Sequence, residues 1–401
     1  MIKVSTRVSV NYFQARDAEL ELEKAASYTD IRLTNIKRHW SETPLDEPEE
    51  FYSLWAQPGE AAASFSAICL FWAEQVQDEL REQGHSVPIG LIDATWGGTI
   101  IEAWSPPEAL EACDVADAGL DEEHNHNNYL WNGMIQPLTK LAIRGALWYQ
   151  GESNTGHNME IYDCLFENLI SSWRQRWWGT QGYTDLTFPF GFVQLGPNTD
   201  NKHSFRWPLV RWKQTGGFGF VPNHDLKNVF MAVAMDDDIN LHPKNKRLPS
   251  SRLSWAALNL VYGDLYEDSL ALPPLMGPRP IAVHVDYTTG SSSIKITFDA
   301  ELEPVLREED RFMVCCLASM EECDAHHYGE GWEGVSVQGE VGDGHVTEVS
   351  LEVTEACEAG PISGVAYLWL ETPCAGEAAC PLYTADQYRM PVAPFRLPLN
   401  A

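Results

Sequence analysis

Basic residues are scarce in this sequence of 401 residues. Lys and Arg together number 27, against 58 Asp and Glu, and the formal net charge is -31. Nucleic acid and anionic membranes are therefore poor partners, because both would be repelled over much of the protein surface. An acidic protein can still bind an acidic sugar, provided that one of its pockets is locally basic.

Long apolar runs and targeting signals are also absent from the sequence. No apolar run reaches about 18 residues, so no membrane-spanning helix is predicted. The first residues, MIKVSTRVSVNYFQ, do not contain the apolar core of a signal peptide. An Asn-x-Ser/Thr acceptor for glycosylation does not occur either, which is unusual for a secreted protein of this size.

The nine cysteines lack the spacing of a metal site. Six of them lie between residues 315 and 380, and there is no Cys-x-x-Cys pair or Cys/His metal spacing. We therefore expect disulfides in the C-terminal part of the chain and no bound metal, which favours an oxidising compartment. Reduced, buried thiols in a cytosolic protein are the alternative. The spacing leaves the disulfide pairing open.

The sequence does contain a repeated alternation of strands, polar turns and helices. Buried strands are predicted at residues 88–96, 142–149, 188–195 and 229–235. Helices are predicted at residues 16–27, 65–83, 160–178 and 246–262. Such an alternation is typical of an α/β fold with a doubly wound parallel sheet. The rest of the first 60 residues is predicted to be mostly irregular.

After about residue 270 the pattern changes to period-two alternation. Strands are predicted at residues 281–285, 293–298, 312–317, 346–353 and 364–370, with Gly, Asp and Pro turns between them. This pattern indicates a C-terminal β-sandwich. We therefore predict two domains, residues 1–270 and residues 271–401.

Polar turns follow three of the predicted strands. They are Gly97-Gly98, the segment from Gln150 to Asn154, and Asp236-Asp237-Asp238. Ligands of open α/β sheets bind outside the carboxyl ends of the strands, so these turns are candidates for a functional site. Paired glycines let backbone N–H groups approach a ligand closely. Each turn could instead have a purely structural role, in which its polar groups only form hydrogen bonds with its own backbone.

His242 is the best candidate for a general base among the 12 histidines. It follows Asp236 and Asp238, and either carboxylate could orient an imidazole and stabilise its charged form. The alternative for the aspartates is helix capping or plain solvation. A lone histidine is more often structural than catalytic.

Seven blocks of the sequence resemble a known family. In chain order they are PIGLIDATWGGTIIEAWSP, LWNGMIQPL, GALWYQGESN, FPFGFVQL, RWKQTGGFGFVPN, FMAVAMD and HPKNK. Together with the Cys315-Cys316 pair and the closing CPLY, they resemble the sialate O-acetylesterases of the SGNH-hydrolase superfamily. The likeness covers nearly the whole chain and implies an SGNH-type esterase domain followed by a β-sandwich.

Serine esterase chemistry is what this resemblance implies. A serine would attack the acetyl carbonyl of an O-acetylated sialic acid, and His242 would take up the serine proton. The backbone N–H of Gly97 or Gly98 would donate to the oxyanion, an interaction worth about 3 kcal/mol to the transition state. No metal or organic cofactor is implied, because serine acyl transfer needs none.

The resemblance also suggests residues that line the same site. Gln150 lies in the position of the family's third block, with Glu152 and Asn154 nearby. Arg211 could pair with the sialic carboxylate, or it could form a structural ion pair. The superfamily often places an aspartate three residues before the histidine. Ile239 stands at that position here, which leaves the orienting carboxylate open.

The nucleophile motif of the family does not occur in the sequence. Where the Gly-Gln-Ser-Asn-Met turn is expected, the sequence reads MIKVSTR. The family's first β-rich section and signal peptide are also missing. We therefore expect an N-terminally incomplete, truncated form with weak or no activity. Ser153 could act instead, although it lacks the second glycine of G-x-S-x-G. Ser5 could also act, but no strand–turn–helix pattern is recognised around it.

Other functions stay open at this stage. A glycoside hydrolase could use Glu152 and an aspartate as paired carboxylates. A non-catalytic protein could bind glycans without turnover. Release of acetate, release of reducing sugar, and binding without turnover distinguish the three functions. The resemblance implies a lysosomal or secreted location, although no signal peptide is seen in the sequence.

Overall fold

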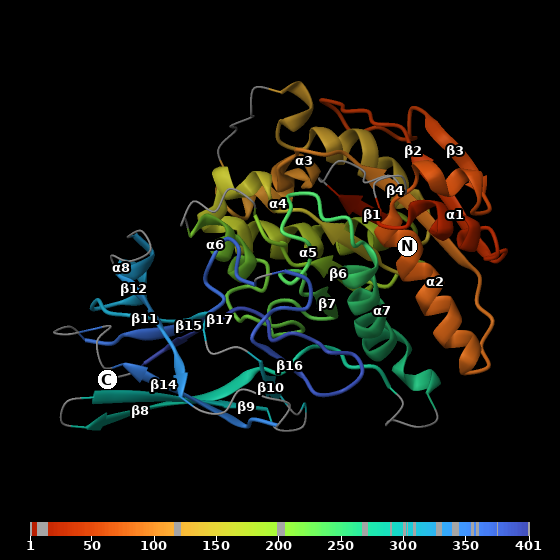
Figure 1. The fold of residues 1–401 in the computed structure, drawn as a ribbon. Coiled ribbons are helices and arrows are strands. Elements are labelled where there is room, and N and C mark those ends of the chain that lie inside the picture. The colour runs from red at the N-terminus through yellow and green to blue at the C-terminus, as the bar shows by residue number, and fades with distance from the viewer. Residues whose placement is uncertain are drawn as a thin grey trace. The chain divides into compact units, whose positions relative to one another are not determined.

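The computed structural model describes most of the chain. The described residues are 2–5, 15–115, 122–198, 205–266, 272–288, 291–299, 302, 304–307, 310–325, 331–338, 345–353, 357, 361–374 and 376–399. The chain forms two compact units, shown together in Figure 1. Unit 1 comprises Met1–Leu195, Val221–Ala232 and His242–Leu275, and unit 2 comprises Gly196–Phe220, Val233–Leu241 and Met276–Ala401. The domain division at residue 270 stays a prediction. It differs from these units because Gly196–Phe220 and Val233–Leu241 belong to unit 2.

A seven-stranded sheet forms the centre of unit 1. Its order is β3 (Phe51–Ala56), β2 (Ile31–Ile36), β4 (Ile89–Thr95), β1 (Ile2–Ser5), β5 (Ala146–Tyr149), β6 (Phe190–Val193) and β7 (Val229–Ala232). All neighbours run parallel except β3, which is antiparallel to β2. This arrangement confirms the predicted doubly wound fold. The strands β1, β2 and β3 lie within the first 60 residues, where the sequence predicted one helix and no strand.

The four helices predicted in unit 1 are present, and two short helices at residues 101–104 and 107–111 were not predicted. They are α1 (Ala18–Ala25), α2 (Ala67–Glu82), α3 (Ile101–Trp104), α4 (Pro107–Glu111), α5 (Tyr162–Gln181) and α7 (Arg247–Tyr262). Helix α5 buries Phe166 against Phe190 and Phe192 of β6, with ring centroids 5.9 and 5.2 Å apart. Burial of one such ring contributes about 1.5–3 kcal/mol. Among the described residues, no helix has the length and apolar character needed to cross a membrane.

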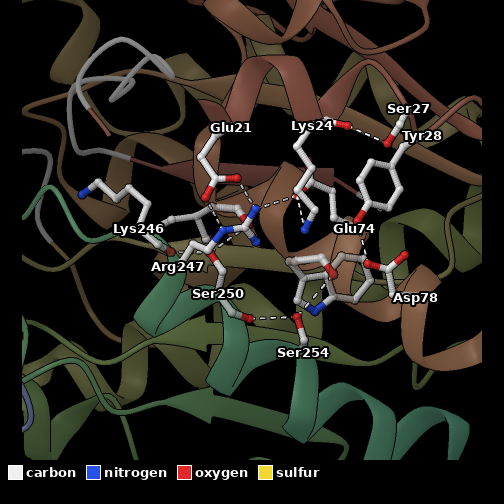
Figure 2. Close-up of polar contacts among 12 residues, drawn as sticks. Glu21, Lys24, Ser27, Tyr28, Glu74, Asp78, Lys246, Arg247, Ser250 and Ser254 are labelled. Atoms are coloured by element: carbon white, nitrogen blue, oxygen red, sulfur yellow. Dashed lines mark hydrogen bonds and ion pairs between the residues drawn. The ribbon is translucent and has the colours of Figure 1, made fainter. Parts of the chain in front are cut away.

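A buried carboxylate joins helices α1, α2 and α7. Figure 2 shows the Arg247 guanidinium between Glu21 and Glu74, and its Nη2 lies 3.0 Å from Oε2 of Glu74. The Glu74 side chain is fully buried, and Nζ of Lys24 lies 4.0 Å from the same oxygen. Burial raises the pKa of Glu74, although Arg247 and Lys24 act in the opposite direction. The charge of Glu74 is thus kept inside the protein chiefly by Arg247.

Two serines allow α7 to pack closely on α2. The hydroxyl of Ser250 lies 3.2 Å from the carbonyl oxygen of Ile68, and that of Ser254 lies 3.2 Å from the carbonyl oxygen of Trp72. The same hydroxyls also donate within α7, to Lys246 and Ser250 (Figure 2). Small side chains at these positions therefore bring the two helices together beside the Glu74 cluster.

Unit 2 is built mainly from antiparallel sheets. One contains β12 (Trp332–Val335), β11 (Phe312–Cys315), β15 (Gly364–Tyr367) and β17 (Phe395–Pro398). The other contains β13 (Val337–Gln338), β14 (Glu348–Val353), β9 (Ser291–Phe298) and β8 (Pro280–Thr288), and β10 (Pro304–Leu306) pairs with β16 (Leu382–Thr384). The Phe298 and Phe395 rings, one from each large sheet, lie 6.0 Å apart. The predicted C-terminal β-sandwich is confirmed. Helices α6 (Arg206–Lys213) and α8 (Met320–Ala325) complete the unit.

Disulfides occur in both units. Unit 2 contains Cys315–Cys323, Cys316–Cys357 and Cys374–Cys380, as expected from the cluster of cysteines in its sequence. In unit 1, Cys113–Cys164 links the chain after α4 to the first turn of α5. The sequence did not reveal this last pair, because its two cysteines are 51 residues apart.

Replacing both Cys113 and Cys164 by serine is expected to lower the free energy of unfolding by about 2–4 kcal/mol. The physical reason is that the disulfide closes a long loop and so restricts the unfolded chain. Urea denaturation of the oxidised proteins measures the loss. A matched Cys374→Ser/Cys380→Ser variant opens a loop of only 6 residues. A larger loss in that control would contradict the loop-length argument.

Candidate active site

Three chain segments of unit 1 meet at the carboxyl edge of its sheet. Strand β4 leads into Gly97–Gly98, β5 leads into Gln150, and β1 ends at Ser5 between them. Ser5 is in register with Thr95 of β4 and Tyr149 of β5. In the sheet order, β2 and β4 lie on one side of β1, and β5 lies on its other side. The chain therefore goes from β1 to β2 in one direction along the sheet, and from β4 to β5 in the opposite direction. This is a topological switch point, where α/β sheets bind their ligands.

Ser5 is therefore better placed than its sequence suggested. No strand was predicted around it, because only four residues form β1 and they do not make a long apolar run. The structure makes Ser5 the last residue of the central strand. Ser153, the other candidate, begins the 3-10 segment Ser153–Gly156 after β5 and is half-buried.

The glycine turn after β4 exposes backbone and is held in place by side chains. Gly98 is exposed and has a φ of 78°, in the left-handed region that favours glycine. The Asn125 carboxamide accepts from the N–H of Ile100 at 2.9 Å and donates to the carbonyl of Gly98 at 3.1 Å. The hydroxyl of Thr99 donates to the carbonyl of Trp96 at 3.0 Å. The N–H groups of this turn are thus preorganised, as an oxyanion site requires.

Gln150 links the two turns and is completely buried. Its Nε2 donates to the carbonyl of Thr99 at 3.2 Å and to Oδ1 of Asn154 at 2.5 Å. The hydroxyl of Tyr162, in the first turn of α5, donates to its Oε1 at 2.7 Å. Both ends of the carboxamide therefore take part in fixing the turns after β4 and β5 relative to each other.

Asn154 extends this network to a buried carboxylate. Its Nδ2 donates to Oε2 of Glu102 and to the carbonyl of His157, both at 3.0 Å. Its Oδ1 accepts from the N–H of Ile101 at 2.9 Å. Nδ2 of Asn158 donates to the other oxygen of Glu102 at 2.8 Å. Glu102 was not predicted as a site residue. Its place within the apolar block TIIEAW was nevertheless a signal, because a carboxylate is costly to bury without partners.

Glu152 lies at the edge of this network. It is half-buried and follows Gly151, which has a φ of 140°. A Cβ on Gly151 would lie 3.2 Å from the Leu195 side chain, so the turn packs tightly there. Gln150 and Asn154 thus contact the chain directly after the glycine turn, and Glu152 lies between them in the sequence. That the three residues line one site with the glycine turn stays a prediction.

The predicted base and its aspartates fall in different units. His242 is exposed and lies in unit 1, a few residues before α7. Asp236 is buried in unit 2, where Oδ2 accepts from the hydroxyl of Tyr383 at 2.7 Å. Asp238 is half-buried in unit 2, and its N–H donates to Oδ1 of Asp237 at 2.7 Å. Orientation of His242 by either aspartate stays a prediction.

Arg211 has a different role from the one suggested by the resemblance. It lies on α6 in unit 2 and has no exposed surface. Its guanidinium donates to the carbonyls of Leu370, Gly196 and Glu371 at 2.6, 2.7 and 2.8 Å. A buried guanidinium that holds three backbone carbonyls connects segments of unit 2. This placement argues against contact with a sialic carboxylate.

Comparison with known proteins shows the family to which the chain belongs. Residues 19–239 match the family model described as "Carbohydrate esterase, sialic acid-specific acetylesterase", and residues 283–399 match "Sialate O-acetylesterase C-terminal domain". The human sialate O-acetylesterase is 31% identical over 410 residues, which cover 97% of this chain and 73% of the human protein. The mouse enzyme is 30% identical over 427 residues, covering 95% of this chain and 74% of the mouse protein.

A solved structure extends the comparison to the fold. A carbohydrate acetylesterase from Xanthomonas citri has a TM-score of 0.75 and 23% identity, with 99% of this chain and 80% of that chain covered. This structure supports the fold, and the family match over residues 19–239 defines the class of the carbohydrate esterases. Within this class, the chain belongs to the family of the sialic acid-specific acetylesterases, or sialate O-acetylesterases.

Proposed function

We propose that the protein hydrolyses O-acetyl esters of sialic acids by serine acyl transfer. The observation that carries the proposal is the meeting of β1, the Gly97–Gly98 turn and the Gln150 network at one switch point, in a chain of this family. Among the described residues, no comparable arrangement favours the two alternatives, a glycoside hydrolase and a non-catalytic glycan-binding protein. The implied substrate is a small molecule or glycan that carries an O-acetylated sialic acid.

The reaction would proceed through an acetyl-serine. The serine Oγ attacks the acetyl carbonyl carbon while its proton passes to His242, and the oxyanion accepts a hydrogen bond from the backbone N–H of Gly98 or Gly97. Collapse of the tetrahedral intermediate breaks the bond to the sugar oxygen, which takes the proton from His242. Water then releases acetate from the serine by the same steps.

The position in the sheet favours Ser5 over Ser153 as the nucleophile. A residue that ends the central strand lies between the glycine turn and Gln150, whereas Ser153 begins a segment beyond the β5 turn. The Gly-Gln-Ser-Asn-Met turn of the family does not occur in the sequence. We therefore expect the 401-residue chain to release acetate slowly or not at all.

Acetate release from O-acetylated sialic acid tests this function. His242→Ala is expected to lower the rate at least about 100-fold, because a general base contributes on that order. His224→Ala removes an exposed histidine of unit 1 and is the matched control. Ser5→Ala should abolish turnover and Ser153→Ala should retain it. If the unaltered chain releases acetate at a measurable rate, an equal rate for His242→Ala would contradict the proposal. Release of reducing sugar in place of acetate would contradict it as well.

The disulfides support a lysosomal or secreted location for the protein. Four disulfides are formed, and such bonds persist in oxidising compartments. The strongly acidic composition also disfavours nucleic acid and anionic membranes as partners. Binding of O-acetylated sialic acid without any release of acetate would instead favour a glycan-binding role.

A further inference from the structure

Strand β3 forms one edge of the seven-stranded sheet of unit 1. It pairs with β2 on its inner side and is the last strand in the sheet order (Figure 1). Among the described residues, no strand pairs with its outer side. An edge of this kind presents backbone N–H and C=O groups with which a further strand can pair. The outer side of β3 therefore has the backbone groups needed to bind an extended chain.

The side chains of β3 form an exposed apolar patch. Tyr52, Leu54 and Trp55 are 60, 72 and 52% exposed, and Phe51 is 40% exposed. The register of β3 against β2 shifts twice, which breaks the regular alternation of a strand and leaves neighbouring apolar residues exposed together. Natural edge strands are often protected by charged residues or proline, and β3 contains neither. Adjacent exposed apolar side chains of this kind commonly mark an interaction site.

Trp55 is held in place although it is half exposed. A Cβ on Gly90 of β4 would lie 3.4 Å from the Trp55 ring. Because β2 lies between β3 and β4, the indole reaches across β2 and rests on the glycine. A side chain that is already fixed loses little conformational freedom when it binds a partner. Trp55 therefore provides a preformed contact surface beside the edge.

The segment directly before β3 is acidic. It has four exposed carboxylates within five residues, those of Asp46, Glu47, Glu49 and Glu50. Three basic residues form ion pairs with them, namely Lys37, His39 and Lys140. The carboxylates outnumber these partners, so the first end of β3 carries an excess of negative charge. A basic group of a partner would be attracted to this end of the strand.

A second copy of the chain fits this edge poorly. At about 200 Å² for each whole side chain, the exposed parts of the four apolar residues of β3 total roughly 450 Å². A standard stable interface buries about 800 Å² on each partner. Two copies would also bring two acidic segments together, each in a chain of net charge -31. Area and charge therefore both favour a short basic segment of a different protein.

We propose that β3 binds an extended segment of a partner protein by strand addition, and that this segment is apolar and ends in Lys or Arg. An added strand that runs antiparallel to β3 places its C-terminal end beside the start of β3, where the acidic segment lies. Main-chain hydrogen bonds supply affinity, and the apolar patch selects the side chains. Strands β2 and β4 separate β3 from β1, so this binding is independent of the proposed function.

Fluorescence anisotropy of labelled peptides with the full chain tests this edge. The probe peptide has six residues of alternating valine and threonine followed by two lysines. Micromolar binding is expected, because one added strand buries less area than a stable interface. A peptide of the same composition with both lysines at its N-terminus should bind about three- to tenfold more weakly, since exposed charge pairs contribute little each. The probe with N-methylated main-chain amides should bind at least about tenfold more weakly.

Two matched variants locate the binding site on β3. Leu54→Glu removes the most exposed apolar side chain of the strand and adds a negative charge, so it should weaken binding of the probe at least about tenfold. Tyr183→Glu replaces an 84% exposed tyrosine elsewhere in unit 1 and should leave binding unchanged. Circular dichroism checks that both variants fold. If Leu54→Glu does not fold, Leu54→Ser replaces it, with an expected loss of about threefold or more.

Hydrogen exchange distinguishes strand addition from contact through side chains alone. The bound probe should slow the exchange of amides within Phe51–Ala56 more than elsewhere in unit 1. The inference is overturned by any of four results: no binding up to millimolar concentrations, equal binding of the N-methylated peptide, equal binding by the folded Leu54 variant, or no protection of β3.

Light scattering tests for the competing occupant. A dimer of the unaltered chain that Leu54→Glu abolishes would show that a second copy occupies the edge, and would also overturn the inference. Acetate release plays no part in these measurements. The binding edge and the esterase function can therefore fail separately.

Discussion

Replacing Glu102 by alanine is expected to lower the free energy of unfolding by about 3–5 kcal/mol. The carboxylate is fully buried and accepts from the side-chain amides of Asn154 and Asn158. Without it, the buried amide of Asn154 and the half-buried amide of Asn158 each lose a charged acceptor, at about 1–3 kcal/mol each, and a cavity remains. Urea denaturation, with the slope m compared between variants, measures the loss.

Matched variants distinguish the network from a general effect of removing charge. Glu102→Gln keeps the size and one acceptor oxygen but turns an NH₂ group toward a donor, so an intermediate loss is expected. Glu111→Ala removes an exposed carboxylate from the nearby helix α4 and should change stability by less than about 0.5 kcal/mol. If Glu102→Ala proved as stable as Glu111→Ala, the network would not stabilise the candidate active site.

Replacing Arg247 by alanine is expected to cost about 3–5 kcal/mol, because the buried carboxylate of Glu74 would lose its cationic partner at 3.0 Å, while the ammonium of Lys24 lies farther away, at 4.0 Å. The comparison is an exposed pair of similar geometry, Arg176 and Glu108, 2.7 Å apart. Arg176→Ala should cost less than about 1 kcal/mol, since exposed ion pairs contribute little. Chemical denaturation at neutral pH measures both losses. Similar losses at the two sites would contradict a special role of burial.

The destabilisation of the Arg247→Ala variant should depend on pH. Burial raises the pKa of Glu74, and Arg247 is the first of the groups that lower it. Without Arg247, the folded-state pKa of Glu74 rises further above that of the unfolded chain, about 4.3. The folded state tolerates a neutral Glu74. The variant's loss in free energy of unfolding is therefore small below the unfolded-state pKa of Glu74, and it grows as pH rises toward and through the folded-state pKa. A deficit that stays constant from acidic to neutral pH would contradict this account.

Most of the fold could be predicted from the sequence, because the hydrophobic periodicity of a long segment indicates whether it is a helix or a strand and which of its residues are buried. The apolar run at 65–83 predicted α2, and the short apolar blocks ending near 96 and 149 predicted β4 and β5. Strands β1, β2 and β3 were missed. They are short, and β3 lies at the edge of the sheet with half or more of several apolar side chains exposed, among them Tyr52, Leu54 and Trp55. An edge strand has only one neighbour, so its sequence carries little of the buried pattern.

The candidate active site was predictable where its residues lie in one motif. Gln150, Glu152 and Asn154 occur in a single turn, and their proximity to Gly97 and Gly98 followed from the parallel strands that lead into both turns. Glu102 and Tyr162 were missed because a buried polar side chain has no separate sequence signal. Their roles depend on which amide they meet after folding.

Periodicity by itself determined the fold class and the sandwich-like C-terminal part, the cluster of cysteines determined the bias toward disulfides, and contiguous motifs carried the resemblance to the family. These properties are carried by residues that act in large numbers or in contiguous motifs. Only the tertiary structure decided that Ser5 ends the central strand, that Arg211 is buried against backbone carbonyls, and that Arg38 lies beside the glycine turn. Each of these placements depends on segments far apart in the chain, and distance in sequence does not determine distance in space.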